Sequence, residues 1–302
     1  PMTYLPDLNL LTHSMKKTGL INPVLLWKNK ERISIVSGYR RVLVAKLLGW
    51  EKIRAKLYYP EEINSCDGFL LTFYENLGTR RFNLIEAAMV ITGFQKQCGW
   101  GEKQIQEEIL PLLGLHPGRK VLLALQSLLN LTEEGKEFIV KNNISLFNAA
   151  KMATFSPPEQ NFFYPWLTKL KLGENKMREC LEMIEEIVKR DGISVERLFS
   201  FPSFTALLFS GELNISEKTE QFRKALRAIR YPEFTQLQEE FQKHKKKLSL
   251  PPEISILPPE YFEGDKLRLS FECKSLDDFR IVLKKLEDIA DQEDFKKLFD
   301  LL

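Results

Sequence analysis

Hydrophobic and polar positions divide the first sixty residues into alternating helices and strands. A helical period covers residues 8–19. Short apolar runs at Val24–Trp27 and Ile33–Val36 flank a polar turn and predict two strands, and alternation over residues 53–59 predicts a third. The helix expected at Tyr39–Leu48 is apolar on most sides, so we expect it to be buried. The pattern predicts a small α/β unit with helices packed on one sheet.

Apolar residues at helical spacing dominate from residue 69 to about 155. Helices are expected over residues 69–77 and 86–97, and the glycine-containing turn at residues 114–118 separates two further apolar helices. A helix, a short turn and a second helix are typical of a helix-turn-helix module, but an ordinary helical hairpin has the same pattern. The pattern alone favours the hairpin.

The remainder of the chain reads as helices followed by a short mixed segment. Residues 156–235 are helical in pattern, and the proline pairs between 251 and 259 indicate a linker or an edge segment. Alternation at Leu267–Phe271 predicts a strand, and an apolar stripe from Leu276 to Leu298 predicts an amphipathic helix. This strand and helix could cap the protein or form a dimer interface, and core packing explains them equally well.

The predicted fold class is therefore α+β and mostly α, with a small N-terminal α/β domain, a central all-α domain and a small C-terminal α/β domain. The predicted boundaries are residues 1–78, 79–155, 156–248 (a helical extension and linker) and 249–302.

Composition restricts the function classes. The formal net charge is only +3, so a nucleic-acid surface would have to come from local clustering of the 44 basic residues. The four cysteines, at positions 66, 98, 180 and 273, lie far apart and show no zinc spacing, so we expect reduced thiols in a cytoplasmic protein. No apolar run approaches the length of a membrane span, and we expect no membrane partner.

The segment Gly38-Tyr39-Arg40-Arg41, between a predicted strand and a predicted helix, is the first candidate site. Glycine allows close backbone approach, free amides at a helix start favour anions, and arginine matches phosphate oxygens. An ordinary turn with two surface arginines explains the same residues without a ligand.

Two shorter signals accompany this turn. Glu75 and Asn76 supply adjacent hard oxygen atoms, which suit magnesium when phosphates complete its shell. The loop Gly19–Pro23 could place its backbone against a base or sugar, although a helix stop followed by a turn needs no ligand.

The order of these motifs resembles the ParB family of chromosome and plasmid partition proteins. Three boxes carry the resemblance over residues 8–160: Gly19-Leu20-Ile21-Asn22-Pro23-Val24, Ile35-Val36-Ser37-Gly38-Tyr39-Arg40-Arg41, and Glu75-Asn76-Leu77 through Asn83-Leu84-Ile85-Glu86-Ala87-Ala88. The resemblance implies a CTP-binding domain, a helix-turn-helix that reads double-stranded DNA, and a C-terminal homodimer that closes as a clamp. It further implies a nucleoid-associated location and a partition ATPase as a partner.

The same resemblance assigns roles to individual residues. Gly38, Tyr39, Arg40 and Arg41 would border the triphosphate, Asn22 would lie near the nucleotide, and Glu75 and Asn76 would approach Mg²⁺ through the nucleotide. On the presumed recognition helix, the residues able to reach DNA are Arg119, Lys120, Gln126 and Ser127.

Three departures from the family pattern lead to alternatives. Tyr39 stands where the family has a glutamate, so we expect at most a slow CTPase. Thr79 and Arg81 replace an arginine and an acidic residue, and the recognition helix Lys120–Leu129 is mostly aliphatic. A nucleotide-gated adaptor or transcription regulator without site-specific DNA binding is therefore the second hypothesis, and a phosphotransferase on the same fold is the third.

Overall fold

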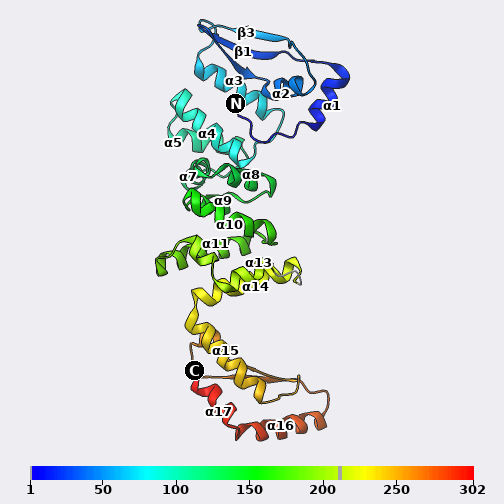
Figure 1. Ribbon diagram of the computed structural model, residues 1–302, viewed down its shortest axis with the longest axis vertical. Coiled ribbons are helices and arrows are strands. Elements are labelled where there is room, and N and C mark those ends of the chain that lie inside the picture. Colours follow the sequence, from blue (N-terminus) through cyan, green and yellow to red (C-terminus); the bar gives the residue numbers. More distant parts are fainter. Residues whose placement is uncertain (1, 210–212) are drawn as a thin grey trace. The chain divides into compact units, whose positions relative to one another are not determined.

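The computed structural model describes residues 2–209 and 213–302, and it is mostly helical with a three-stranded and a two-stranded sheet (Figure 1). The chain forms two compact units: residues up to 181 with 194–196, and residues 182–193 with 197–302. The high content of helix together with two small sheets confirms the predicted α+β, mostly α fold class. The predicted division into four segments is finer than these two units and stays a prediction.

The N-terminal sheet has the strand order β2-β1-β3. β1 (Val24–Asn29) pairs antiparallel with β2 (Arg32–Ser37) and parallel with β3 (Ala55–Tyr58). α1 (Asn9–Thr18) packs on α2 (Tyr39–Leu47). The buried residues of this contact are Met15, Leu20, Val44 and Ala45. Each of these elements lies where its hydrophobic pattern predicts it.

α2 is less buried than its composition predicts. Val44 and Ala45 are its buried residues, whereas Leu47 is 69% exposed. The helix packs on α1 and β1, and its residues 39–43 are half-buried. The prediction of a buried helix is therefore confirmed only in part, because the last residues of the helix are exposed.

α3 (Ser65–Leu77) and α4 (Leu84–Cys98) cross at very close range. A Cβ atom on Gly93 of α4 would lie 2.1 Å from Cε2 of Phe69 on α3, so only glycine fits there. Phe94 packs edge-on against Phe69, with the ring centroids 5.1 Å apart. Both helices begin with a capping box, in which an asparagine side chain and the third helical residue satisfy each other's backbone amides.

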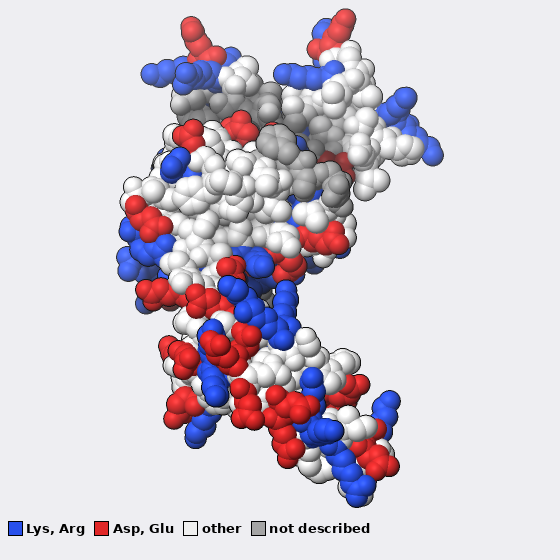
Figure 2. Space-filling model, turned by 60° about the horizontal axis from the view of Figure 1, so that its bottom comes forward, with Lys and Arg blue, Asp and Glu red and all other residues white. Residues whose placement is uncertain are grey.

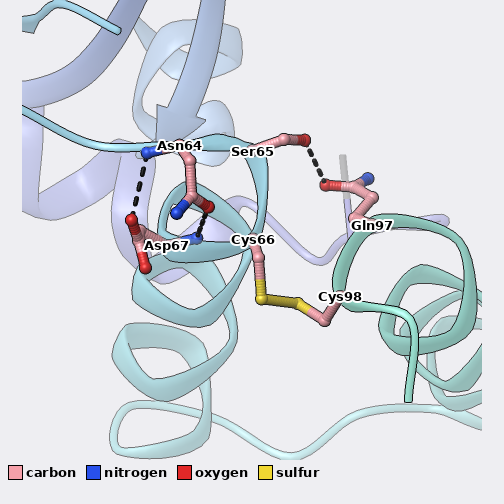
Figure 3. The surroundings of a disulfide bond; sticks show 6 residues. All are labelled: Asn64, Ser65, Cys66, Asp67, Gln97 and Cys98. Atoms are coloured by element: carbon pink, nitrogen blue, oxygen red, sulfur yellow. Dashed lines mark hydrogen bonds between the residues drawn. A yellow bond between two sulfur atoms is a disulfide. The ribbon is translucent and has the colours of Figure 1, made fainter. Parts of the chain in front are cut away.

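A disulfide joins Cys66, in the first turn of α3, to Cys98, the last residue of α4 (Figure 3). The two Cα atoms are 4.8 Å apart, and 32 residues separate the cysteines in the sequence. The prediction of reduced thiols is wrong for this pair, because two helices that cross with opposite ends together bring distant cysteines into contact. Of the other two cysteines, Cys180 is buried and Cys273 is exposed.

Short helices follow α4 and complete the central part of the first unit. They are α5 (Glu102–Gln104), the π-helical turn η1 (Ile105–Ile109), α6 (Leu110–Leu112), α7 (Arg119–Ser127), the 3-10 turn η2 (Leu128–Asn130), α8 (Glu133–Lys141) and α9 (Leu146–Met152). Residues 102–112 are continuously helical, and the turn before α7 contains two glycines with positive φ, as the glycine pattern predicts.

The predicted helical region from residue 156 onward is helical in the structure. Its helices are α10 (Pro157–Lys169), α11 (Glu174–Asp191), α12 (Val195–Phe199), α13 (Pro202–Phe209), α14 (Ile215–Arg230) and α15 (Pro232–Lys247). The four tryptophans of the chain, at positions 27, 50, 100 and 166, all belong to the first compact unit.

The second unit ends in a small α/β module. Its elements after α15 are β4 (Ile254–Leu257), the 3-10 turn η3 (Glu260–Phe262), β5 (Arg268–Phe271), α16 (Leu276–Ala290) and α17 (Glu293–Asp300). A core of Phe241, Leu248, Ile256, Phe262, Ile289 and Leu298 holds them together. The segment between the two proline pairs, interpreted as a linker or edge, is the strand β4, which pairs antiparallel with the predicted strand β5.

Candidate functional site

The turn between β2 and α2 has a backbone that only glycine adopts without strain. Gly38 has φ 94° and ψ 17°, in the left-handed region. A Cβ atom there would lie 2.8 Å from Cγ1 of Val24 and 3.0 Å from Nε of Arg41. The carbonyl of Gly38 accepts the first helical hydrogen bond, from the amide of Val42 at 3.1 Å. The sequence pattern of strand, glycine and helix is therefore realised in the structure.

This turn forms one wall of a cavity of about 400 Å³ in the first unit. The loop after α1, the β2–α2 turn and the C-terminal half of α3 supply most of its lining. All the residues predicted to contact the nucleotide or its metal line it: Asn22, Gly38, Tyr39, Arg40, Arg41, Glu75 and Asn76. Residues separated by more than fifty positions thus converge on one cavity. What this cavity binds stays a prediction.

Arg41 holds two walls of the cavity together. Its Nη1 donates to the backbone carbonyls of Asn22, at 2.9 Å, and Pro23, at 3.0 Å. Its Nη2 forms an ion pair with Oε1 of Glu75 at 2.7 Å. The guanidinium therefore fixes the loop after α1 and the end of α3 relative to the turn.

Arg40 is less completely satisfied. Its Nη2 donates to Oε1 of Glu86 at 3.2 Å, but its Nε is buried and, within residues 2–209 and 213–302, has no hydrogen-bond partner. A buried donor without a partner costs on the order of 1–3 kcal/mol. Because this Nε is closed to solvent, an anion in the cavity would reach it only after the guanidinium turned.

Glu75 and Asn76 present oxygen atoms that are already engaged by cations. Glu75 pairs with Arg41, and Oδ1 of Asn76 accepts from Nε of Arg80 at 2.8 Å. The amide nitrogen of Asn76 donates to the carbonyl of Thr72 at 2.7 Å. Among the described residues, no group of three or more His, Cys, Asp or Glu side chains could hold a metal ion. Mg²⁺ at these residues would thus depend on phosphate oxygens for most of its ligands.

Sequence reasoning gave no role to Glu86, the most enclosed charge beside the cavity. Its side chain is 1% exposed. Oε1 accepts from Nη2 of Arg40 and the backbone amide of Tyr4, and Oε2 accepts from Nη1 of Arg80, at 2.5 Å, and the backbone amide of Asn83. The spacing Asn83-x-x-Glu86 before an apolar run signals a capping box, and it could have identified Glu86 as a structural centre.

Arg80 lines the cavity and is largely buried. Burial lowers the pKa of its guanidinium, Glu86 opposes that shift, and Arg40 adds to it. Two arginines thus share one carboxylate at the cavity wall. Thr79 stands where the family pattern has an arginine, and Arg80, one position later, lies in the lining of the cavity.

The residues predicted to bind DNA all lie on α7, and each has an intramolecular contact; what they bind stays a prediction. Nε of Arg119 lies 3.5 Å from Oε2 of Glu102, and Lys120 lies over the ring of Phe147 at 4.9 Å. Nε2 of Gln126 donates to Gln95 at 3.1 Å, and the hydroxyl of Ser127 donates to the carbonyl of Ala124 at 2.7 Å. Leu123 occupies the same outer face of α7 and is 46% exposed.

One face of the molecule carries charges of both signs. On the face that Figure 2 shows, basic and acidic side chains are interleaved. Interleaved charges weaken the long-range field that attracts a polyanion. Within the described residues, no helix is long and apolar enough to cross a membrane.

Comparisons with known proteins agree with the predicted resemblance. Residues 5–67 match the family model described as the ParB N-terminal domain. The chain is 27% identical over 145 residues to a probable plasmid-partitioning protein ParB of Xylella fastidiosa, covering 47% of this chain and 34% of that protein. It is 24% identical over 186 residues to a probable chromosome-partitioning protein ParB of Campylobacter jejuni, covering 62% and 63%. The matches thus span about a third to just under two thirds of these relatives.

Two solved structures of the C-terminally truncated chromosome-partitioning protein ParB from Caulobacter crescentus are also similar. The complex with CTP-gamma-S is 20% identical, has a TM-score of 0.23, and covers 52% of this chain and 86% of that chain. The complex with the centromeric parS site is 18% identical, has a TM-score of 0.31, and covers 65% and 88%. The family model and the curated relatives confirm the resemblance to the ParB family.

Proposed function

Because residues 5–67 match the ParB N-terminal domain, we propose that this chain is a CTP-responsive, DNA-binding protein of the chromosome- or plasmid-partition type that acts as a homodimeric clamp. The observation that carries the proposal is the convergence of the predicted nucleotide residues on one cavity, where Arg40 has a buried donor that finds no partner among the described residues. Gly38, Arg40 and Arg41 would hold the phosphates, Asn22 the nucleoside side, and Glu75 and Asn76 the Mg²⁺.

Calorimetric titration of the full chain with each of the four nucleoside triphosphates and Mg²⁺ tests the nucleotide site. We expect CTP to bind, and Arg40→Ala or Arg41→Ala to weaken binding at least about 100-fold, because each removes charge-assisted hydrogen bonds to phosphate. Lys46→Ala is the matched control, since it removes an exposed cation from the same helix outside the cavity lining. Absence of binding by any triphosphate would contradict the proposal.

Hydrolysis is expected to be slow or absent. Tyr39 lines the cavity where the family has a glutamate, and a phenol supplies no carboxylate to orient or activate water. Phosphate release by the wild type should therefore be close to background, and Tyr39→Glu should raise it. Rapid release by the wild type would contradict this part of the proposal.

DNA binding is the second part of the proposal, through Arg119, Lys120, Gln126 and Ser127 on α7. The names of the curated relatives favour it, whereas the intramolecular partners of these side chains favour the alternative, a nucleotide-gated protein–protein adaptor without site-specific DNA binding. Fluorescence anisotropy with a DNA duplex at increasing salt distinguishes the two. A clamp with several phosphate contacts loses affinity steeply with salt, and an adaptor shows no binding even at low salt.

A homodimer through the C-terminal module is the third part. Apolar side chains are exposed there on β5 and on one face of α16: Leu276, Phe279 and Leu283 recur at helical spacing, and the ring of Phe271 on β5 lies 6.0 Å from that of Phe279. Such a patch is typical of an interaction surface. Sedimentation analysis should give a dimer for the wild type and a monomer for Phe271→Glu. A monomeric wild type would contradict the dimer.

A cytoplasmic, nucleoid-associated location and contact with a partition ATPase complete the proposal. The Cys66–Cys98 disulfide argues against that location, because cytoplasmic thiols are mostly kept reduced. Measuring the redox state of this pair in the source cells by thiol alkylation tests the location directly.

A further inference from the structure

Glu86 is a buried carboxylate beside the cavity. It is buried between Arg40 and Arg80, and four donors share its two oxygen atoms. Its oxygen Oε1 serves two of them, Nη2 of Arg40 at 3.2 Å and the backbone amide of Tyr4 at 3.1 Å. A change at Arg40 therefore bears directly on the contact with Tyr4.

Tyr4 belongs to an N-terminal strap, which we define as residues 2–7 before α1. The strap is held by polar contacts to distant segments: Arg80 donates to the carbonyl of Met2, and Nδ2 of Asn83 donates to the carbonyl of Tyr4 at 3.1 Å. Leu5 has φ 43°, a left-handed conformation that costs a leucine about 1–2 kcal/mol. The strap is thus a strained segment that depends on its contacts.

The strap connects the cavity to the helical domain. Met2 lines the cavity, and the hydroxyl of Tyr4 donates to Oε2 of Glu133 at 3.2 Å, in the first turn of α8. Contacts thus run without interruption from Arg40 through Glu86 and Tyr4 to Glu133.

A bound phosphate and the carboxylate of Glu86 cannot both keep full hydrogen bonding to the guanidinium of Arg40. A phosphate that engages the guanidinium competes with Glu86 for its hydrogen bonds and repels the carboxylate. The Nε of Arg40 has no partner in the described part of the chain, and because it is buried it becomes available to a phosphate only when the guanidinium moves. Further donors become available as Glu86 gives up Nη2.

We propose that Glu86 is a resident counter-ion that a nucleotide phosphate displaces from Arg40, and that this displacement loosens the strap from α4 and α8. This inference rests on the proposed nucleotide-binding function. It makes Glu86 a regulatory residue that lowers nucleotide affinity and reports occupancy of the cavity to the helical domain.

Glu86→Gln is the decisive variant, because glutamine keeps the shape of the side chain, loses the charge and replaces one of the two acceptor oxygens by a donor. We expect it to bind CTP and Mg²⁺ about tenfold more tightly than the wild type in calorimetric titration. We also expect a lower melting temperature without nucleotide, because Arg40 and Arg80 then repel each other. A residue that served only the fold would lower the melting temperature and leave affinity unchanged or weaker.

Glu159→Gln is the matched control. Glu159 is the capping-box residue of α10, where its carboxylate accepts hydrogen bonds from the backbone amide and the hydroxyl of Ser156, and in the described part of the chain it has no arginine partner. It should leave CTP affinity within about twofold of the wild type.

Hydrogen exchange of the wild type gives a second measurement that does not depend on any variant. Adding CTP and Mg²⁺ should speed exchange in the strap, residues 2–7, and Glu86→Gln should show the fast rate without nucleotide. If the wild type binds CTP but the strap's exchange does not rise, or Glu86→Gln binds no more tightly, this inference alone falls. If no triphosphate binds the wild type, that result contradicts the proposed function and therefore also this inference.

Discussion

The cavity and the outer face of α7 were both predicted to carry ligand-binding residues, and they differ in how their charges are held. At the cavity, Arg40, Arg41 and Arg80 are mostly enclosed, and they contact carboxylates and backbone carbonyls from distant segments. On α7, Arg119 is 74% exposed at its side chain and makes a single long ion pair with Glu102. Both regions lie in the first compact unit.

This difference indicates where charge is needed for the fold itself. Enclosed ion pairs interact strongly because little water screens them, and the loss of one partner strands the other. Exposed ion pairs contribute only about 0–1 kcal/mol. The cavity charges are thus part of the architecture, whereas those on α7 are free to change with function.

Arg80→Ala should produce the largest loss of stability. The buried carboxylate of Glu86 would lose its 2.5 Å partner, and breaking a buried ion pair costs about 3–5 kcal/mol. Urea unfolding measures this loss, with Arg119→Ala as the matched control at less than about 1 kcal/mol. Equal losses for the two arginines would remove the distinction between the regions.

Replacing both Cys66 and Cys98 by serine should produce the second largest loss of stability. The disulfide joins α3, which lines the cavity, to α4, on which α7 packs, and closing a loop of 32 residues stabilises by about 3–4 kcal/mol. Denaturant unfolding with and without a thiol reductant checks this. The exposed Cys273→Ser should change nothing, and a wild type indifferent to reductant would refute the prediction.

Gly38→Ala should cost about 2–3 kcal/mol, since a positive φ is strained for alanine and its Cβ would meet Val24 at 2.8 Å. CTP binding should weaken in this variant. Any DNA binding through α7 should keep its wild-type affinity at temperatures where both the variant and the wild type are folded. Gly78→Ala, at the end of α3 with φ −72°, should be neutral or slightly stabilising. Full nucleotide binding by Gly38→Ala would show that the turn is not part of the site.

The double variant Arg119→Ala, Lys120→Ala should have the smallest effect on stability, below about 1 kcal/mol in thermal unfolding. It removes an exposed ion pair and an exposed cation–π contact with Phe147. If α7 contacts DNA phosphates, the slope of log affinity against log salt should fall by about two. An unchanged slope would assign DNA binding to another surface or favour the adaptor.

The sequence predicted best what is local. The strand, glycine turn and helix around Gly38 follow from hydrophobic period and glycine geometry, and the lining of the cavity contains each residue expected there. The order of three short motifs was needed to bring Asn22 and Glu75 together in one hypothesis, because nothing in their own neighbourhoods predicts a contact.

Contacts between distant segments escaped prediction for physical reasons. Glu86 meets Arg40 across 46 positions and Tyr4 across 82, and neither contact leaves a periodic signal. The Cys66–Cys98 pair depends on the crossing of α3 and α4, which the buried contact of Gly93 with Phe69 determines. β4 was hidden by flanking prolines, which are also compatible with a linker.

The division of the chain into two compact units has a spectroscopic consequence. All four tryptophans belong to the first unit. Fluorescence excited at wavelengths that only tryptophan absorbs therefore reports on that unit alone. Circular dichroism reports on helices in both. Comparing the two signals during unfolding would therefore separate the melting of the unit with the cavity from that of the C-terminal module without any engineered label.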